Sequence, residues 1–204
     1  MITITLEDLV LEAHQRVPES ADRLAVFVHG SGSSRHSPRN NYVADRLAED
    51  GIASILFDLL TEEEDRSRET RFDIDLLTGR VRGVLGWVAG QPGLADLQAH
   101  LFGSSTGAPA AIRTAVVSER QVCSIVSRGG RPDLAGEDLE RLKTPCLLVV
   151  GGNDRQVLSL NQDAKEKIKG ECELRVVEGA SHLFEEPGAL DKVAELASEW
   201  ICAH

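Results

Sequence analysis

The sequence contains no run of about 18 consecutive apolar residues, the length that a transmembrane helix requires. Basic residues are in the minority, because 22 Lys and Arg stand against 33 Asp and Glu and give a formal net charge of −11. Phosphate groups and anionic lipid surfaces bind clusters of cations, so this charge argues against nucleic acid and against a membrane as the main partner. The first residues show neither a basic start nor an apolar block, so no secretory leader is expected.

Cysteine is also sparse, and the four residues show no CxxC spacing. Each lies in or beside an apolar run: Cys123, Cys146, Cys172 and Cys202. This pattern favours buried free thiols in a reducing cytoplasm over a zinc site or a disulfide framework. We find no internal repeat and no linker, so a single domain spanning residues 1–204 is expected, with a cytoplasmic location.

Eight strands are predicted from the spacing of apolar residues. Apolar and polar residues alternate over residues 2–6 and 9–17, which predicts a half-exposed antiparallel hairpin at one edge of a sheet. Four runs are continuously apolar, as in strands covered on both faces: residues 24–28, 52–57, 122–126 and 146–150. Two weaker strands are predicted at residues 97–102 and 173–177.

Helical segments alternate with these strands. Apolar or small residues recur at helical spacing in four of them: residues 74–88, 106–117, 156–169 and 190–201. An alternation of strand and helix from the third strand onward implies right-handed crossovers and a mostly parallel sheet. The expected fold class is therefore α/β, an eight-stranded sheet flanked by helices.

A candidate nucleophile follows the fifth predicted strand. Gly103, Ser105 and Gly107 form the pattern G-x-S-x-G, and an alanine-rich helix is predicted directly after it. A sharp turn from strand to helix lifts a serine oxygen clear of the sheet, and the small flanking residues let strand and helix approach closely. The start of the helix also favours developing negative charge. Ser104 is the competing hydroxyl, but its position in the motif is not the exposed one.

A serine nucleophile needs a base, and the base needs an orienting acid. Asp154 follows the seventh predicted strand on a glycine-rich turn, and His182 follows the eighth. The carboxyl ends of parallel strands meet at one edge of a sheet, so the order Ser105, Asp154, His182 predicts a catalytic triad. The sequence leaves two other acids and one other base open: Asp58, Asp133 and His36.

The loop of residues 29–36, the oxyanion loop, follows the third predicted strand and is expected to complete an oxyanion hole. The first donor would be the backbone N–H of Thr106, the residue after the candidate nucleophile. We predict the N–H of Ser31 as the second donor, with that of Gly32 as the alternative. His29 is expected to brace this turn.

Four motifs together resemble the α/β-hydrolase superfamily over nearly the whole chain: His29-Gly30, Gly103-x-Ser105-x-Gly107, Gly152-x-Asp154 and Gly179-x-x-His182. The small size, the loop HGSGSSRHSPRN and the segment SRGGRPDL look like the dienelactone-hydrolase-like branch, in particular the small hydrolases sometimes fused to phosphoribosyltransferase domains. Dienelactone hydrolases carry cysteine at the elbow, whereas this chain has Ser105, which favours ordinary ester hydrolysis. The resemblance implies an α/β-hydrolase fold, and residues 127–144 leave room for a short helix at 136–142 but not for a cap domain.

Arginines follow two of the predicted strands near the expected mouth of the site. Arg35, Arg39, Arg128 and Arg131 could hold an anionic substrate group, as the resemblance implies, because dienelactone hydrolases bind carboxylates. Alternatively, they pin loops to acidic neighbours such as Asp58 and Asp133.

The connection of residues 59–72 carries an acidic run followed by arginines. It is predicted to be a solvated loop or the start of a helix, and a flap over the site is the alternative.

The sequence therefore predicts a serine hydrolase of the carboxylesterase type, which cleaves small ester or lactone substrates through an acyl-enzyme on Ser105. The expected partner is a small-molecule ester, the expected assembly is a monomer or homodimer, and neither a metal nor an organic cofactor is implied. A chain without a cap has little apolar surface for a long acyl chain, so true lipase activity is not expected. A non-catalytic hydrolase-fold binding or scaffold protein, or an acyltransferase that uses the same triad, are the alternatives.

Overall fold

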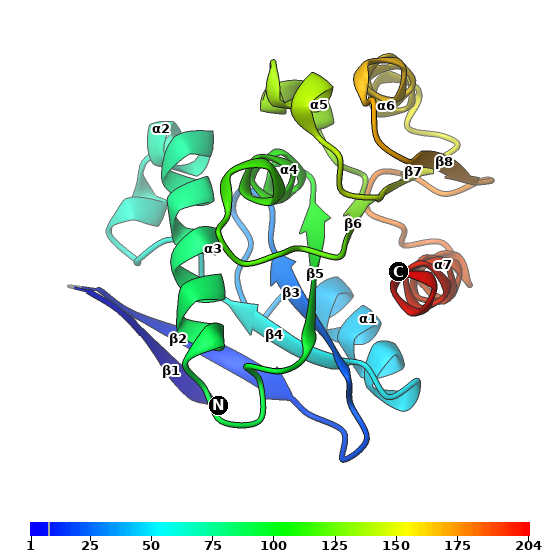
Figure 1. Ribbon diagram of the computed structural model, residues 1–204. Helices are drawn as coiled ribbons and strands as arrows, with labels where there is room; N and C mark the ends of the chain where they lie inside the picture. Colours follow the sequence, from blue (N-terminus) through cyan, green and yellow to red (C-terminus); the bar gives the residue numbers. More distant parts are fainter. Residues whose placement is uncertain (8) are drawn as a thin grey trace.

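A computed structural model describes residues 1–7 and 9–204 and shows a central sheet between two layers of helices (Figure 1). The sheet has the strand order β1-β2-β4-β3-β5-β6-β7-β8. The strands are β1 Ile2–Leu6, β2 Leu9–Arg16, β3 Arg23–Val28, β4 Ala53–Phe57, β5 Gln98–Ser104, β6 Ser124–Arg128, β7 Cys146–Gly151 and β8 Cys172–Val177. The main helices are α1 Pro38–Glu49, α3 Ile74–Ala89, α4 Gly107–Val117, α6 Arg155–Lys167 and α7 Ala189–Ala203.

The predicted topology is confirmed. β1 and β2 form an antiparallel hairpin, β2 is antiparallel to β4, and the remaining neighbours are parallel. The strand whose bounds differ most from the prediction is β6: the sequence pattern predicts residues 122–126, and the strand spans Ser124–Arg128. Its parallel ladder with β5 starts at the pair His100 and Ser124, so Val122 precedes the sheet although it is apolar and buried.

The sheet is covered on both faces, as the continuously apolar strands predict. Helices α3, α4 and α6 pack on one face, and α1 and α7 pack on the other (Figure 1). Alternate residues of a strand enter opposite cores, so that Val26 of β3 packs with the first layer and Phe27 with the second. The central strands are thereby fixed from both sides, and their carboxyl ends present loops at one edge.

Helix α1 was not among the predicted helices. Its buried face consists of Asn40, Val43, Ala44 and Leu47, which have helical spacing but include a polar residue. Ser37 caps its N-terminus, because the Ser37 side chain accepts a hydrogen bond from the Asn40 N–H at 3.3 Å, and proline follows at the first helical position. This start signal is present in the sequence, at Ser37 and Pro38.

Two connections remain short. Between β6 and β7 the described chain forms only the 3₁₀ helix η2, Pro132–Ala135, and α5, Asp138–Arg141, so no cap domain is inserted there. The connection after β4 folds into the 3₁₀ helix η1, Glu64–Arg66, and the short α2, Arg68–Arg71. None of the helices described has both the length and the hydropathy needed to cross a membrane.

Candidate active site

Ser105 lies on the sharp turn between β5 and α4, with a φ of +50° that non-glycine residues seldom adopt. Both glycines of the motif are required by close backbone contacts. A Cβ at Gly103 would lie 2.6 Å from Ala108 Cα, and a Cβ at Gly107 would lie 2.1 Å from Val28 O. The turn is therefore a strained strand-to-helix elbow of the kind that exposes a serine nucleophile.

Asp154 and His182 are joined by a hydrogen bond of 2.7 Å between Asp154 Oδ2 and His182 Nδ1. The other carboxylate oxygen of Asp154 accepts a long bond of 3.4 Å from the Val157 N–H and caps α6. Asp154 thus orients the imidazole through Nδ1, which leaves Nε2 as the nitrogen that can exchange a proton with a nucleophile.

Ser105 and His182 line one pocket of about 130 Å³ at the carboxyl edge of the sheet. No hydrogen bond joins Ser105 Oγ to His182 among the described residues, and such contacts commonly tighten only when substrate binds. Of the three residues predicted as a triad, Ser105 and His182 are brought to one pocket, and Asp154 is hydrogen-bonded to the imidazole.

The loops that carry the acid and the base are fastened to each other. Asn153 donates from its side chain to Gly179 O at 2.7 Å and from its backbone N–H to Ala180 O at 2.9 Å. Gly151 lies directly beneath the loop that carries His182, the histidine loop, because a Cβ at Gly151 would be 2.4 Å from Ala180 O. Asn153 is not a residue of any predicted motif, although its position next to the predicted acid marks it as part of the same turn.

Phe184 provides a second anchor for the histidine loop. Its ring is fully buried and its φ is +56°, which places a strained backbone two residues after His182. The Ser181 N–H, one residue before His182, donates to Glu186 Oε2 at 3.0 Å. Packing and hydrogen bonding therefore fix the backbone on both sides of the imidazole.

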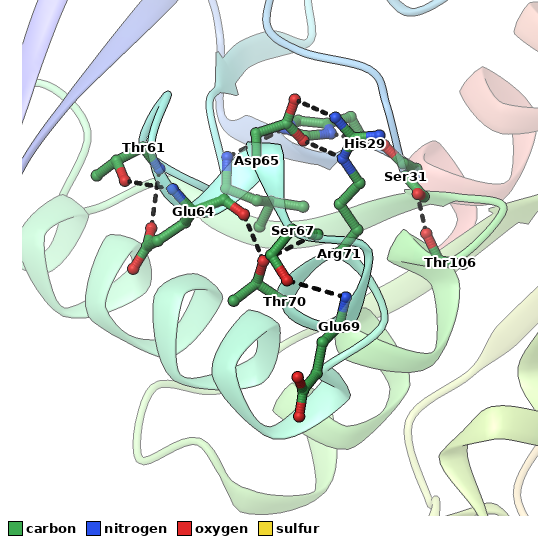
Figure 2. A network of polar contacts seen from close by, with 12 residues as sticks. His29, Ser31, Thr61, Glu64, Asp65, Ser67, Glu69, Thr70, Arg71 and Thr106 are labelled. Atoms are coloured by element: carbon green, nitrogen blue, oxygen red, sulfur yellow. Dashed lines mark hydrogen bonds and ion pairs between the residues drawn. The ribbon is translucent and has the colours of Figure 1, made fainter.

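The oxyanion loop differs from the sequence prediction in one respect. The N–H of Ser31, the predicted second donor, donates to Thr106 Oγ1 at 2.7 Å (Figure 2). The N–H of Thr106 makes no hydrogen bond among the described residues. Gly32, the alternative donor, has a φ of +69° and lies in a turn closed by the bond from Ser33 N–H to Gly30 O at 3.2 Å.

His29 braces this loop, as expected. Its Nε2 accepts from the Leu59 N–H at 3.0 Å, and its Nδ1 lies 2.9 Å from Gly30 O. An Nε2 that accepts a hydrogen bond requires the neutral ring with its proton on Nδ1. Burial lowers the pKa of His29, which is consistent with this neutral form.

The alternative acids and base have other partners. Asp58 pairs with Arg35 and also accepts from the Arg35 N–H at 2.7 Å. Asp133 forms a bidentate pair with Arg131 at 2.8 and 2.7 Å. His36 packs edge-on against His14, with ring centroids 5.0 Å apart. Among the described residues, the imidazole of His182 is hydrogen-bonded to Asp154 and not to Asp58, Asp133 or His36.

Of the four arginines singled out in the sequence, Arg39 and Arg128 line the pocket that contains Ser105. Arg35 and Arg131 are held by carboxylates in the way that the alternative interpretation requires. Arg128 is 9% exposed and has no ion pair with a carboxylate in the described chain. Burial, followed by the nearby charge of Arg39, lowers the pKa of Arg128 to about 10, so the guanidinium is still charged at neutral pH.

Arg128 is held by Asn40, a buried residue of α1 that no sequence motif marks as functional. Asn40 Oδ1 accepts from Arg128 Nη2 at 3.2 Å and from Ser104 Oγ at 3.0 Å. Arg128 Nη1 is buried and has no hydrogen-bond partner in the part of the chain that the structure describes, and the guanidinium lies 6.0 Å from the centre of the Phe184 ring. Ser104 therefore supports the pocket wall and is not the exposed hydroxyl.

The segment predicted as a loop or a flap lies beside the oxyanion loop (Figure 2). Asp65 and Arg71, paired at 2.9 Å, line a small cavity together with Gly30, Ser31 and Gly32. No residue of 59–72 lines the pocket of Ser105 and His182. The segment supports the loop from the outside and does not cover the candidate active site.

Comparison with known proteins identifies a family match over most of the chain. The sequence profile of a family described as "Alpha/beta hydrolase domain" matches residues 21–199. A crystal structure of dienelactone hydrolase from Anabaena variabilis is 45% identical and superimposes with a TM-score of 0.96, covering 100% of this chain and 96% of that one. Est1E from Butyrivibrio proteoclasticus, 14% identical, superimposes with a TM-score of 0.83 over 99% of this chain and 97% of its own, a likeness of fold alone.

Two curated sequences from strains of Mycobacterium tuberculosis, provisionally named phosphoribosyl transferases, are 54% identical over 191 residues. The match covers 94% of this chain, but the chain spans only 43% of the length of these relatives. The profile and the Anabaena structure confirm the expected fold class.

Proposed function

The chain belongs to the α/β-hydrolase family, in its dienelactone-hydrolase-like branch, and from this premise we propose that it is a serine hydrolase that cleaves ester bonds in small molecules. The observation that carries the proposal is the pocket that Ser105 and His182 share, with Asp154 holding the far side of the imidazole at 2.7 Å. A protein that only bound ligands would have no need for a serine and a histidine at one pocket with a carboxylate bonded to the imidazole.

The proposed reaction is acyl transfer to water. Ser105 Oγ attacks the ester carbonyl carbon while His182 Nε2 takes the hydroxyl proton, and Asp154 stabilises the imidazolium through Nδ1. The tetrahedral intermediate collapses to an acyl-enzyme, and the leaving alcohol receives the proton from His182. Water then attacks the acyl carbon, again losing a proton to His182, and the acid is released as Ser105 regains its proton.

Fluorophosphonate labelling tests the identity of the nucleophile. The wild type should be labelled and should hydrolyse short p-nitrophenyl esters, whereas Ser105→Ala should lose both activities. Ser104→Ala is the matched control, because its hydroxyl is the neighbour of Ser105 and is bonded to Asn40. This control should still be labelled.

Three outcomes would change the assignment. Persistent labelling of Ser105→Ala would exclude Ser105 as the nucleophile. A wild type that reacts with no serine-directed reagent would favour the binding or scaffold protein. A wild type that is labelled, but forms product only when an acceptor alcohol or amine is added, would be an acyltransferase.

We further propose that the substrate carries an anionic group, which Arg128 binds. A buried guanidinium without a carboxylate partner is costly, and an anionic substrate would compensate its charge. Arg39, the second arginine that lines the pocket, has a weak pair with the exposed Glu185 at 3.5 Å and adds to the positive potential.

Paired substrates test this preference. The kcat/KM for the p-nitrophenyl monoester of a dicarboxylic acid should exceed that for a neutral ester of the same length. Arg39→Gln should reduce this ratio about tenfold, the size of a single charged contact. Arg131→Gln should leave the ratio unchanged, because Arg131 is bound to Asp133 away from the pocket. Equal kcat/KM values for the two esters in the wild type would contradict the anionic substrate.

Phosphoribosyl transfer is not proposed for this chain. The name of the mycobacterial relatives describes proteins of which this chain spans 43%. The part that is shared carries the hydrolase profile, which matches residues 21–199 here.

A further inference from the structure

Thr106 has a side chain whose role the proposed triad does not explain. It stands directly after Ser105 and is the first residue before α4, where threonine commonly caps a helix through its hydroxyl. Within residues 1–7 and 9–204 the side chain makes no capping hydrogen bond, and the residue is only 4% exposed. The hydroxyl is turned toward the oxyanion loop and accepts the N–H of Ser31 at 2.7 Å (Figure 2).

This contact changes which hydrogen-bond donors are available in the oxyanion hole. An N–H group carries one proton, and that of Ser31 is directed at Thr106 Oγ1 and not at a substrate oxygen. The hydroxyl accepts in this contact, so its own proton remains available, and it finds no acceptor among the described residues. The predicted second donor is therefore replaced, in this arrangement, by a hydroxyl that has a proton to give.

The position of this hydroxyl suits an oxyanion donor. Oxyanion donors lie about 2.7–3.1 Å from the developing charge. Thr106 Oγ1 belongs to one of the two predicted donor residues and is hydrogen-bonded to the N–H of the other, Ser31. The oxyanion loop packs directly on the nucleophile, because a Cβ at Gly30 would lie 2.9 Å from Ser105 Cβ. Ser31, whose N–H binds this hydroxyl, lines the pocket of Ser105 and His182, so the hydroxyl is one hydrogen bond away from the pocket wall.

We propose that the side-chain hydroxyl of Thr106 is a catalytic donor, which hydrogen-bonds the oxyanion while the Ser31 N–H polarises it. This inference rests on the proposed role of Ser105. The hydroxyl proton stays on Thr106 throughout, so the step adds a hydrogen bond and transfers no group. A hydroxyl that accepts from an N–H becomes a stronger donor, so Ser31 contributes to the same charge through Thr106.

Thr106→Val tests the proposal, since valine keeps the shape of threonine and lacks the hydroxyl. With p-nitrophenyl esters, kcat should fall by about 10²–10³, the effect of losing one oxyanion donor, while KM changes little. Thr106→Ser retains a hydroxyl and should stay within a few-fold of the wild type. Affinity for a trifluoromethyl ketone, which forms the tetrahedral adduct, should fall in parallel with kcat/KM.

The matched control is Thr114→Val on the same helix. Thr114 is buried, and its hydroxyl has no hydrogen-bond partner among the described residues, so its removal should leave kcat unchanged. The unfolding temperature of each variant shows whether it is folded, and Thr106→Ala replaces Thr106→Val should the latter fail to fold.

Each remaining outcome decides between the proposals. A Thr106→Val enzyme as fast as the wild type, or faster, would show that the hydroxyl only accepts the hydrogen bond of the Ser31 N–H and does not act on the oxyanion. Equal losses in Thr106→Val and Thr106→Ser would assign Thr106 to packing. The rate of fluorophosphonate labelling is read in the same variants, so a wild type labelled at Ser105 with no effect of Thr106→Val overturns this inference alone. Absence of labelling in the wild type would overturn the proposed function and this inference together.

Discussion

Single backbone positions determine the geometry around Ser105. The serine has a φ of +50°, and the helix after it starts so close to β3 that residue 107 has no room for a side chain. A non-glycine residue in such a conformation costs about 1–3 kcal/mol, which the surrounding packing must offset. The elbow therefore depends on the absence of a side chain at residue 107 as much as on attractive contacts.

We expect Gly107→Ala to disrupt this turn. The new Cβ would lie 2.1 Å from Val28 O and 2.6 Å from His29 O, both backbone atoms that a side-chain rotation cannot move. Overpacking of this kind destabilises a protein by about 1–3 kcal/mol or more, and the displaced elbow should lose most of its fluorophosphonate labelling. Urea unfolding and the labelling rate are the two measurements.

Gly86→Ala on α3 is the control for this substitution. A Cβ at Gly86 would meet nothing within 4 Å, and alanine is the better helix former by about 0.5–1 kcal/mol. The control should therefore be slightly more stable and fully labelled. If Gly107→Ala behaved in the same way, the close packing of α4 on β3 would not determine the elbow.

At the scale of elements, the strands and the positions of Ser105, Asp154 and His182 could be predicted from the sequence. Strands buried on both faces have a continuous apolar signal, and polar residues directly after them are easily recognised. Helix α1 has a weaker signal, because Asn40 replaces an apolar residue on its buried face.

The partner of the Ser31 N–H could not be predicted, because it depends on a loop geometry that no periodicity encodes. Two backbone segments 75 residues apart meet there, and only coordinates show that Thr106 Oγ1 is the acceptor. The same holds for Arg128. Its sequence context is that of Arg131, and only the structure shows that one lines the pocket while the other is paired with Asp133.

Asn40 is expected to be the residue that fixes α1 against the sheet edge. Asn40→Ala removes the acceptor of both Ser104 and Arg128, and it leaves the buried guanidinium with one contact fewer. Loss of a buried partner costs about 1–3 kcal/mol, which urea unfolding should detect as a lower midpoint with an unchanged slope.

Tyr42→Phe on the same helix is the comparison. Tyr42 is an exposed residue hydrogen-bonded to Asp191 of α7, and surface changes of this kind usually stay within about 0.5 kcal/mol. Similar midpoints for Asn40→Ala and Tyr42→Phe would show that the buried contacts of Asn40 add no stability.

At the scale of the whole molecule, one sheet connects all parts of the fold. The ladder is continuous from β1 to β8, and helices on either face bury alternate residues of the same strands. A layer could not unfold without exposing one face of strands that the other layer still covers. We therefore expect residues 1–204 to unfold as one cooperative domain.

The two tryptophans of the chain report on the two layers separately. Trp87 belongs to α3 on one face of the sheet, and Trp200 belongs to α7 on the other. In Trp200→Phe the fluorescence comes from Trp87 alone, and in Trp87→Phe it comes from Trp200 alone. For each variant, the midpoint of urea unfolding followed by fluorescence should coincide with the midpoint followed by far-ultraviolet circular dichroism, because loss of either layer would expose the shared sheet. Comparing two probes within one variant removes the effect of the substitution on stability. In either variant, a fluorescence midpoint at a lower urea concentration than the circular dichroism midpoint would mean that one helical layer unfolds first. The chain would then contain two parts that unfold separately.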